Sequence, residues 1–402
     1  MARRAVQDAD SHPSSMKDVS QDEAKSQQVD SGTPSKGAEQ IKAKVENTVK
    51  NFIGFMSSMR MLVLVILCLQ NSIFTVLRRY SQGVLKEIYS KHEVLLVGEI
   101  IKMAFSAWMI SKDLPPDCPD IKTRLTYLVE TSKKMVGLAL IYGAMNILSY
   151  VSLRNIGAGI FTIFAQLKIL TTASMSALIL RRRYSWARWR ALISLMFGVL
   201  LFSEPIWGDP SKRQANEGGS AFIGCTAVLI EVSLSGFASI YFEKVIKTDP
   251  LQLNIWERNF QLALGSFPVY LFFMMTELGG EAGFFGGWSF TAWILSLLGA
   301  GGGLLVALSI KYGDSILKTL ATTGAIILSS LLDHYLLGGP LTPSMMIAGV
   351  QVIIAICNYT FDTTPIEQLP DPPQPKKLEE AEEDKKETDD EEVALISKQQ
   401  SS

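Results

Sequence analysis

Residues 158–180 read AGIFTIFAQLKILTTASMSALIL, an apolar run with a single charged side chain, Lys168, near its centre. The run matches the roughly 20 residues that an α-helix needs to cross the hydrocarbon core of a bilayer. A lysine at the middle of such a helix costs about 2.5–3.5 kcal/mol on insertion scales, so it should face a partner or a cavity. The stretch therefore predicts a membrane-spanning helix that contributes to a polar site.

Nine other stretches share this apolar character. They lie near residues 60–77, 94–111, 135–153, 187–204, 221–240, 256–275, 288–310, 315–337 and 341–359. A soluble domain would alternate short apolar faces with polar ones, whereas long apolar runs indicate membrane spans. We therefore expect an all-α polytopic membrane protein whose residues 51–362 form ten transmembrane helices.

The two ends of the chain have a different composition. Residues 1–50 are rich in Ser, Lys, Gln and Asp, and residues 363–402 are rich in Pro, then in Glu, Asp and Lys. Neither segment has enough apolar residues to build a core, so both are predicted to be disordered, the second as an acidic tail. An even number of helices places both tails on one side of the membrane.

The distribution of basic residues assigns that side. Arg181, Arg182 and Arg183 follow the fourth helix, and loops with more lysine and arginine face the cytosol. Both tails are therefore predicted to be cytosolic. The loop after the first helix breaks the pattern with Arg78, Arg79, Lys86 and Lys91, so that helix is longer or these cations serve the site.

Two segments of the chain are similar and occupy matching positions. Residues 166–172 (QLKILTT) and 316–322 (ILKTLAT) both read Lys-x-Leu-x-Thr, and each lies in the fourth helix of a set of five. Because five is odd, the second set would insert upside down relative to the first. The sequence thus predicts a 5+5 inverted repeat, in which binding sites form near the membrane midplane.

The paired lysines, Lys168 and Lys318, indicate an anionic ligand. No acidic residue lies within one turn of Lys168, and lysine is a flexible point charge suited to a phosphate. Thr172 and Thr322 each follow a lysine by four residues and can add a hydroxyl on the same helix face. The alternative for Lys318 is a side chain that reaches the membrane interface.

Other polar residues interrupt the apolar stretches. Tyr142 and Asn146 are spaced by four and form a stripe that suits a base and a ribose, or hydrogen bonding between helices. Asn259 is predicted to face inward, whereas Glu257 and Arg258 are interpreted as a surface pair. Glu231 has no evident partner in the sequence.

Several motifs in one order resemble the nucleotide-sugar transporter family of the drug/metabolite transporter superfamily. They are YGAMN (142–146), FTIFAQLKILTTA (161–173), YFEK (241–244), WERNFQL (256–262) and KYGDSILK (311–318). The match covers roughly residues 60–360. It is similar to the branch that carries UDP-galactose, UDP-N-acetylglucosamine and CMP-sialic acid.

The resemblance implies a Golgi antiporter that exchanges a cytosolic nucleotide sugar, most often a UDP-sugar, for a lumenal nucleoside monophosphate. It implies that Lys168 and Lys318 bind the phosphates and that Tyr142, Asn146 and Asn259 contact the nucleotide, with Thr172 assisting. Ser315, Thr319 and Leu320 depart from the residues usual in the family, which leaves the base and the sugar open.

Other functions stay open at this point. The alternative is a CMP-sialic acid carrier or another organic-phosphate exchanger of the same superfamily. A membrane-embedded glycosyltransferase would need carboxylates or a metal, and the apolar segment offers few acidic residues and no DxD motif. We expect a non-enzymatic carrier with no catalytic residue, metal or cofactor. The endoplasmic reticulum is the second choice of location, and a homodimer is left open.

Overall fold

The computed structural model describes residues 58–369, apart from 116, 117, 119, 210, 212–218 and 277–282. The predicted N-terminal tail and residues 370–402 of the predicted C-terminal tail lie outside the described residues. Eight helical spans in the described part are long and apolar enough to cross a membrane. This confirms a mostly helical, polytopic membrane protein.

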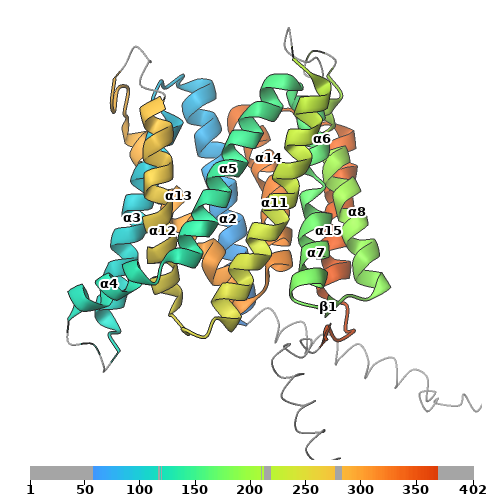
Figure 1. The fold of residues 1–402 in the computed structure, drawn as a ribbon. Helices are drawn as coiled ribbons and strands as arrows, with labels where there is room; N and C mark the ends of the chain where they lie inside the picture. Colours follow the sequence, from blue (N-terminus) through green and yellow to red (C-terminus); the bar gives the residue numbers. More distant parts are fainter. Residues whose placement is uncertain are drawn as a thin grey trace, which may run out of the picture. The chain divides into compact units, whose positions relative to one another are not determined.

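The helices run in alternating directions along one bundle (Figure 1). The long helices of the first half are α2 (Met59–Arg79), α3 (Lys91–Lys112), α5 (Lys133–Asn155), α7 (Lys168–Ile179) and α8 (Trp186–Phe202). Those of the second half are α11 (Ala221–Thr248), α12 (Ile255–Thr276), α13 (Phe290–Tyr312), α14 (Ser315–Leu337) and α15 (Pro343–Thr360). The short elements are η1 (Tyr80–Val84), α4 (Ile121–Glu130), α6 (Ala158–Ala165), β1 (Arg182–Arg183), α9 (Glu204–Trp207) and β2 (Glu367–Gln368).

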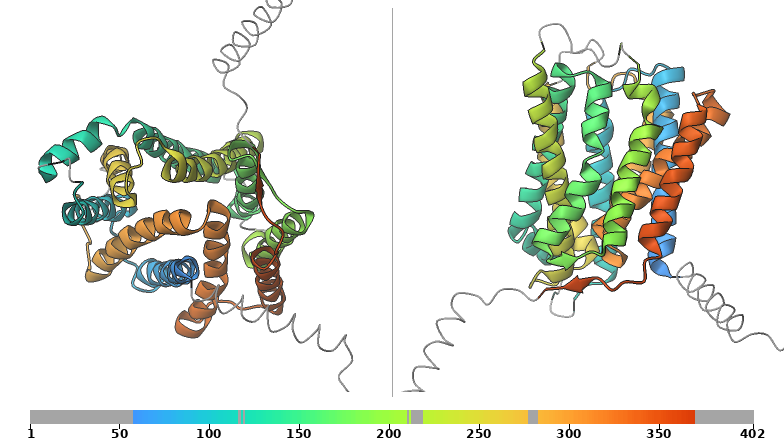
Figure 2. Two further views of the ribbon diagram at one scale, coloured as in Figure 1. Left: turned by 90° about the horizontal axis from the view of Figure 1, so that it is seen from below. Right: turned by 90° about the vertical axis from the view of Figure 1, so that its right-hand side faces the viewer.

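Two long helices fall outside the eight apolar spans. Helix α8 has only 17 residues. Helix α12 has 22 residues, but its first turns bury polar side chains, among them Glu257 and Arg258. The predicted count of ten helices includes both of them, and both lie beside the other helices of the bundle (Figures 1 and 2).

Side-chain caps explain where many of the helices begin. Hydroxyl or carboxylate oxygens accept a hydrogen bond from a backbone N–H in the first turn, which satisfies a group that the helix itself leaves unpaired. The capping residues are Ser58, Ser90, Ser185, Ser220, Ser289, Asp314 and Thr342. Helix α14 ends at Leu337 and is capped by Gly338, whose φ of 66° is a left-handed conformation that glycine adopts without strain.

The long helices contact one another in a regular order. Helix α2 packs against α13 and α14, and α3 packs against α12 and α13. Helix α11 packs against α5 and α7, while α12 also contacts α5. Helix α8 packs against α15. The two helices approach closely at Gly198, where an added Cβ would lie 2.8 Å from Val352 Cγ2. Each half of the chain is therefore packed mainly against the other half.

A small sheet lies at one end of the bundle, called the β1 end below (Figure 1). Strand β2 pairs antiparallel with β1, although the sequence places β2 in the C-terminal tail. Arg188 Nη2 donates to the carbonyls of Asp362 and Thr364, at 3.0 and 2.8 Å. The chain that follows α15 is thereby held across the α7–α8 connection.

Candidate functional site

The predicted helix 158–180 is divided in two just before Lys168. Helix α6 ends at Ala165, and α7 begins at Lys168. The N–H groups of Gln166 and Leu167 donate to the carbonyls three residues earlier, at 3.3 and 3.0 Å, which is the tighter 3₁₀ pattern. Lys168 therefore stands at the N-terminus of a half-helix, where the helix dipole also favours an anion.

Lys168 lies between helices from both halves of the chain. Its side chain is exposed, yet it interacts electrostatically with Glu231 of α11 and with Lys318 of α14. Within the described residues, no carboxylate comes close enough to Lys168 to form an ion pair. The ammonium group thus interacts with residues of both α11 and α14.

Lys318 lies on α14 and contacts α11. Its ammonium lies 3.3 Å from Ser239 Oγ of α11, a long contact with a neutral group. It also interacts electrostatically with Lys168 and with Glu243. The side chain is only half-buried. The structure therefore brings the two predicted lysines together and turns Lys318 toward α11.

Glu231 is the carboxylate that interacts electrostatically with Lys168. It is half-buried, interacts with Ser149 of α5, and leaves Oε2 buried without a hydrogen-bond partner in the described part of the chain. A site with two ammonium groups and one carboxylate has one positive charge in excess. This excess can be neutralised by a phosphorylated ligand.

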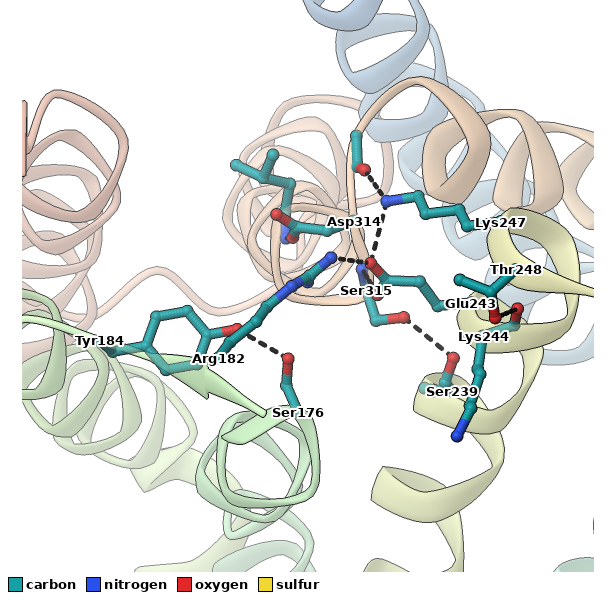
Figure 3. A network of polar contacts seen from close by, with 12 residues as sticks. Ser176, Arg182, Tyr184, Ser239, Glu243, Lys244, Lys247, Thr248, Asp314 and Ser315 are labelled. Atoms are coloured by element: carbon teal, nitrogen blue, oxygen red, sulfur yellow. Dashed lines mark hydrogen bonds and ion pairs between the residues drawn. The ribbon is translucent and has the colours of Figure 1, made fainter. Parts of the chain in front are cut away.

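An ion-pair network joins the connection after α7 to α11 and to the start of α14 (Figure 3). Glu243, which is fully buried, accepts from Arg182 Nη2 at 2.7 Å and from Lys247 Nζ at 2.9 Å. It also accepts from the N–H of Ser315 at 2.8 Å. Because Glu243 is one helical turn beyond Ser239, the network lies one turn of α11 away from the contact of Lys318.

The charge of Arg182 is stabilised in this network. Burial opposes the charged form, but Glu243, Tyr184 and Asp314 more than offset it and raise the pKa of the guanidinium above its usual value. Tyr184 OH in turn lies 2.7 Å from Ser176 Oγ of α7. The connection that follows α7 is thus tied to both α7 and α11.

A second polar group involves α3, α5 and α12. Tyr270 interacts with Asn146 through their side chains, and electrostatically with Tyr142 and Glu99. Glu99 is paired with Lys102 at 2.8 Å. Tyr142 and Asn146 therefore do belong to one cluster, but their shared partner here is Tyr270 rather than the lysine pair.

The remaining predicted site residues are engaged within their own helices. The Thr172 hydroxyl donates to the carbonyl of Lys168 at 2.7 Å, and that of Thr322 donates to Thr319 at 2.9 Å. Asn259 Nδ2 donates to the carbonyl of Ile255 at 2.9 Å. Thr172 and Asn259 are 4% and 1% exposed. Within the described residues, neither of these two side chains forms a hydrogen bond with the ammonium group of Lys168 or Lys318.

The interpretation of Glu257 and Arg258 as a surface pair is wrong. Arg258 is 1% exposed, and its guanidinium lies 3.3 Å from Asp249 Oδ1 and 3.3 Å from Gln261 Oε1. Glu257 is also buried and pairs with Arg124 of α4 at 2.7 Å. Both charges instead join the start of α12 to its neighbours.

Of the partners in the site, Glu231 could be found from the sequence, whereas Ser239 and Tyr270 could not. Glu231 stood out as an acidic residue in an apolar stretch, which is the signal that finds it. Ser239 and Tyr270 carry no such signal, because hydroxyl residues are common in membrane helices and become informative only once the facing helix is known.

These features define a multi-pass helical membrane protein with a cationic site between its helices. The family model described as "Nucleotide-sugar transporter" matches residues 55–360. The chain therefore belongs to the nucleotide-sugar transporter family.

Curated relatives span most of the chain. A human UDP-N-acetylglucosamine transporter is 34% identical over 75% of this chain and 94% of its own length. The UDP-galactose/UDP-N-acetylglucosamine transporter srf-3 of Caenorhabditis elegans is 32% identical over 75% and 83%. A Schizosaccharomyces pombe UDP-galactose transporter is 32% identical over 75% and 88%.

A solved crystal structure shares the fold. It superposes with a TM-score of 0.56 and covers 75% of this chain and 96% of its own, at 14% identity. At that identity the similarity concerns the fold alone.

Proposed function

We propose that this protein is an antiporter that carries a UDP-sugar, such as UDP-galactose or UDP-N-acetylglucosamine, in exchange for a nucleoside monophosphate. The observation that carries the proposal is the electrostatic interaction between Lys168 of α7 and Lys318 of α14, one from each half of the chain. The names of the curated relatives support a UDP-sugar as the substrate. The protein acts as a carrier and not as an enzyme.

The phosphates of the ligand bind between the two ammonium groups. Hydrogen bonds from charged donors to phosphate oxygens are about twice as strong as neutral ones. The N-terminus of α7 adds partial positive charge beside Lys168, as in other carriers built on discontinuous helices. The Tyr142, Asn146 and Tyr270 group offers aromatic and amide contacts for the base and ribose.

Ten transmembrane helices in a 5+5 inverted repeat account for the packing. If α11 to α15 exchange places with α2, α3, α5, α7 and α8, every major helix contact maps either onto another contact or, as for α3–α12 and α8–α15, onto itself. The α2–α14 contact becomes α11–α7, and α3–α13 becomes α12–α5. Such an exchange is what a two-fold axis in the membrane plane produces, and it supports alternating access by rocking of the halves.

Unbalanced charge couples the two directions of transport. In the empty site, Glu231 offsets one of the two lysines and leaves one positive charge without a counter-ion. Moving such a charge through the closed state is costly in a low-dielectric interior. A bound phosphate removes this cost, so the carrier returns loaded and exchange is favoured.

The Glu243 network forms the closed gate in this conformation. By the positive-inside rule, its end of the bundle is cytosolic, because Arg181, Arg182 and Arg183 lie there. Both tails are then cytosolic, and the opposite end faces the Golgi lumen. The site would open to the cytosol when Arg182 and Lys247 separate from Glu243.

Proteoliposomes loaded with UMP test the proposal with a panel of UDP-, CMP- and GDP-sugars. We expect UDP-sugar uptake that internal UMP stimulates and that Lys168→Gln or Lys318→Gln reduces by about tenfold or more, since each lost charged hydrogen bond is worth ~1.5–3 kcal/mol. Lys244→Gln, which removes an exposed lysine of α11, serves as the control. If the protein takes up CMP-sialic acid in preference to UDP-sugars, CMP-sialic acid replaces the UDP-sugar as the proposed substrate. If no nucleotide affects uptake, the proposal is rejected.

A further inference from the structure

A cavity of ≈ 380 Å³ lies at the end of the bundle opposite β1, where α2 ends and α3 begins. Its lining includes Phe74, Arg78, Tyr89, Lys91, His92 and Leu295. We propose that this cavity is a second anion site, which binds a phosphate monoester carried on an aromatic or acyl body. The site is separate from the lysine pair, because none of its lining residues belongs to α7, α11 or α14.

The cavity carries positive charge without matching carboxylates. Arg78 and Lys91 are exposed, and within the described residues neither forms an ion pair. Arg79, next to Arg78, differs because it pairs with Asp333 of α14. A guanidinium and an ammonium that line one hollow without a counter-ion favour an anionic occupant.

The nearby carboxylates are already engaged. Glu87 accepts a hydrogen bond from Ser81 Oγ at 2.5 Å. Glu93 is 3% exposed and accepts from the N–H of Phe285 at 2.8 Å and from Trp288 Nε1 at 2.7 Å. Each carboxylate is therefore held by neutral donors of the fold, and the basic side chains are left to a ligand.

The walls of the cavity suit the rest of the ligand. The Arg78 guanidinium lies 5.8 Å from the centre of the Phe74 ring, and Tyr89 is fixed by a 2.8 Å contact between its OH and Ser81 Oγ. Leu295, which is 1% exposed, adds an apolar surface. The volume lies within the range of small-molecule sites, about 300–1,000 Å³.

The cavity also explains two of the four cations that break the charge rule of the sequence. Arg78 and Lys91 lie at the end with fewer basic loops, where topology alone gives them no role. Two sources supply the proposed chemistry: a nucleoside monophosphate, which rests on the proposed function, or the headgroup of an anionic lipid such as phosphatidic acid.

The test uses the full chain in phosphatidylcholine nanodiscs. Calorimetric titration with UMP is expected to show two classes of site in the wild type. The double variant Arg78→Gln/Lys91→Gln should weaken one class by about tenfold or more, since each charged hydrogen bond is worth ~1.5–3 kcal/mol, and the Lys168→Gln variant should weaken the other. The control is Lys86→Gln, which removes a charge from the same connection but outside the cavity lining. The single variants Arg78→Gln and Lys91→Gln are measured as well, in case the double variant does not fold.

A second arm adds phosphatidic acid to the nanodiscs and measures the lipid retained by native mass spectrometry. Loss of phosphatidic acid retention in the double variant, with UMP binding unchanged, supports the site with a lipid as its source. If neither ligand responds to Arg78→Gln/Lys91→Gln, the second site is rejected. If the Lys168→Gln variant binds UMP as the wild type does, the proposed function is rejected, whatever the result for the double variant.

Discussion

The Thr171 hydroxyl donates a 3.1 Å hydrogen bond to the carbonyl of Val232 and joins α7 to α11. Thr171 lies one turn after Lys168, and Val232 directly follows Glu231, so this contact sets the spacing between the lysine and the carboxylate. A Cβ on Gly236 would lie 2.9 Å from the carbonyl carbon of Thr171, which real Cβ atoms essentially never approach. The crossing therefore depends on the missing side chain.

The substitution Gly236→Ala should destabilise the protein and slow transport. The added methyl group meets rigid backbone, and overpacking of this kind costs about 1–3 kcal/mol. Thermal unfolding in detergent measures the first effect, and uptake into UMP-loaded proteoliposomes measures the second. Gly301→Ala in α13 is the matched control, because a Cβ there meets nothing within 4 Å. Equal unfolding temperatures for the two variants would contradict the close approach.

Neutralising Glu231 should tighten nucleotide binding. The carboxylate attracts Lys168 in the empty site and repels an incoming phosphate, so Glu231→Gln removes a competitor. We expect UMP to bind roughly fivefold more tightly, which corresponds to an interaction of about 1 kcal/mol across a partly hydrated site. Calorimetric titration with UMP measures the change.

The control for this prediction is Glu130→Gln, which removes an exposed carboxylate of α4. Stronger binding should be accompanied by slower uptake into vesicles without internal nucleotide, since the empty site then has two unbalanced lysines. Weaker UMP binding in Glu231→Gln would mean that the carboxylate orients Lys168 for the ligand, and the account of charge balance would fail.

The sequence predicts helices best where local signals and apolar runs agree. For α14, the apolar run 315–337 is flanked by a capping Asp314 and by Gly338, and the observed bounds are the same. The break before Lys168 has no such signal, because Gln, Leu and Lys are all good helix formers. Helix α11 continues to Thr248 beyond the apolar run, since its last turns are held by ion pairs and not by lipid.

The candidate site was predictable only in part, for a physical reason. A lysine in an apolar helix has to find a cavity or a partner, so its charge alone identifies Lys168 and Lys318. A threonine or an asparagine can instead bond to its own helix, as Thr172 and Asn259 do. Spacing by four residues places side chains on one face but does not decide between these outcomes.

The variant Glu243→Gln should be among the most destabilising at the β1 end. An amide there removes the carboxylate that pairs with Arg182 and Lys247 at a fully buried position, and loss of one partner of a buried pair costs about 3–5 kcal/mol. Thermal unfolding in detergent measures the loss. Glu367→Gln on β2, an exposed carboxylate at the same end, is the control and should change little.

A double variant separates the ion pair from simple loss of packing. If the pair carries the effect, Arg182→Gln combined with Glu243→Gln should cost less than the sum of the single variants, because fewer charges are left unpaired. Additive costs would contradict a gate built on this ion pair. The single variants should also favour the form that is open at the β1 end, seen as faster labelling of the site from that side.

The contact between Asp362 and the α7–α8 connection should make stability depend on pH. Hydrogen bonds from Ser185 and Thr364 lower the pKa of the Asp362 carboxyl to about 2. Because this folded-state pKa lies below the unfolded value of about 3.9, the stabilisation is complete above about pH 4 and is lost as the pH falls toward 2. The unfolding temperature of Asp362→Asn should therefore be lower than that of the wild type near neutral pH, and the gap should close in acid. Asp120→Asn, at an exposed aspartate without a side-chain cap contact, is the control. A gap that is the same at every pH would mean that the carboxylate charge does not hold the segment after α15, and that the backbone contacts of Arg188 and the β1–β2 pair hold it alone.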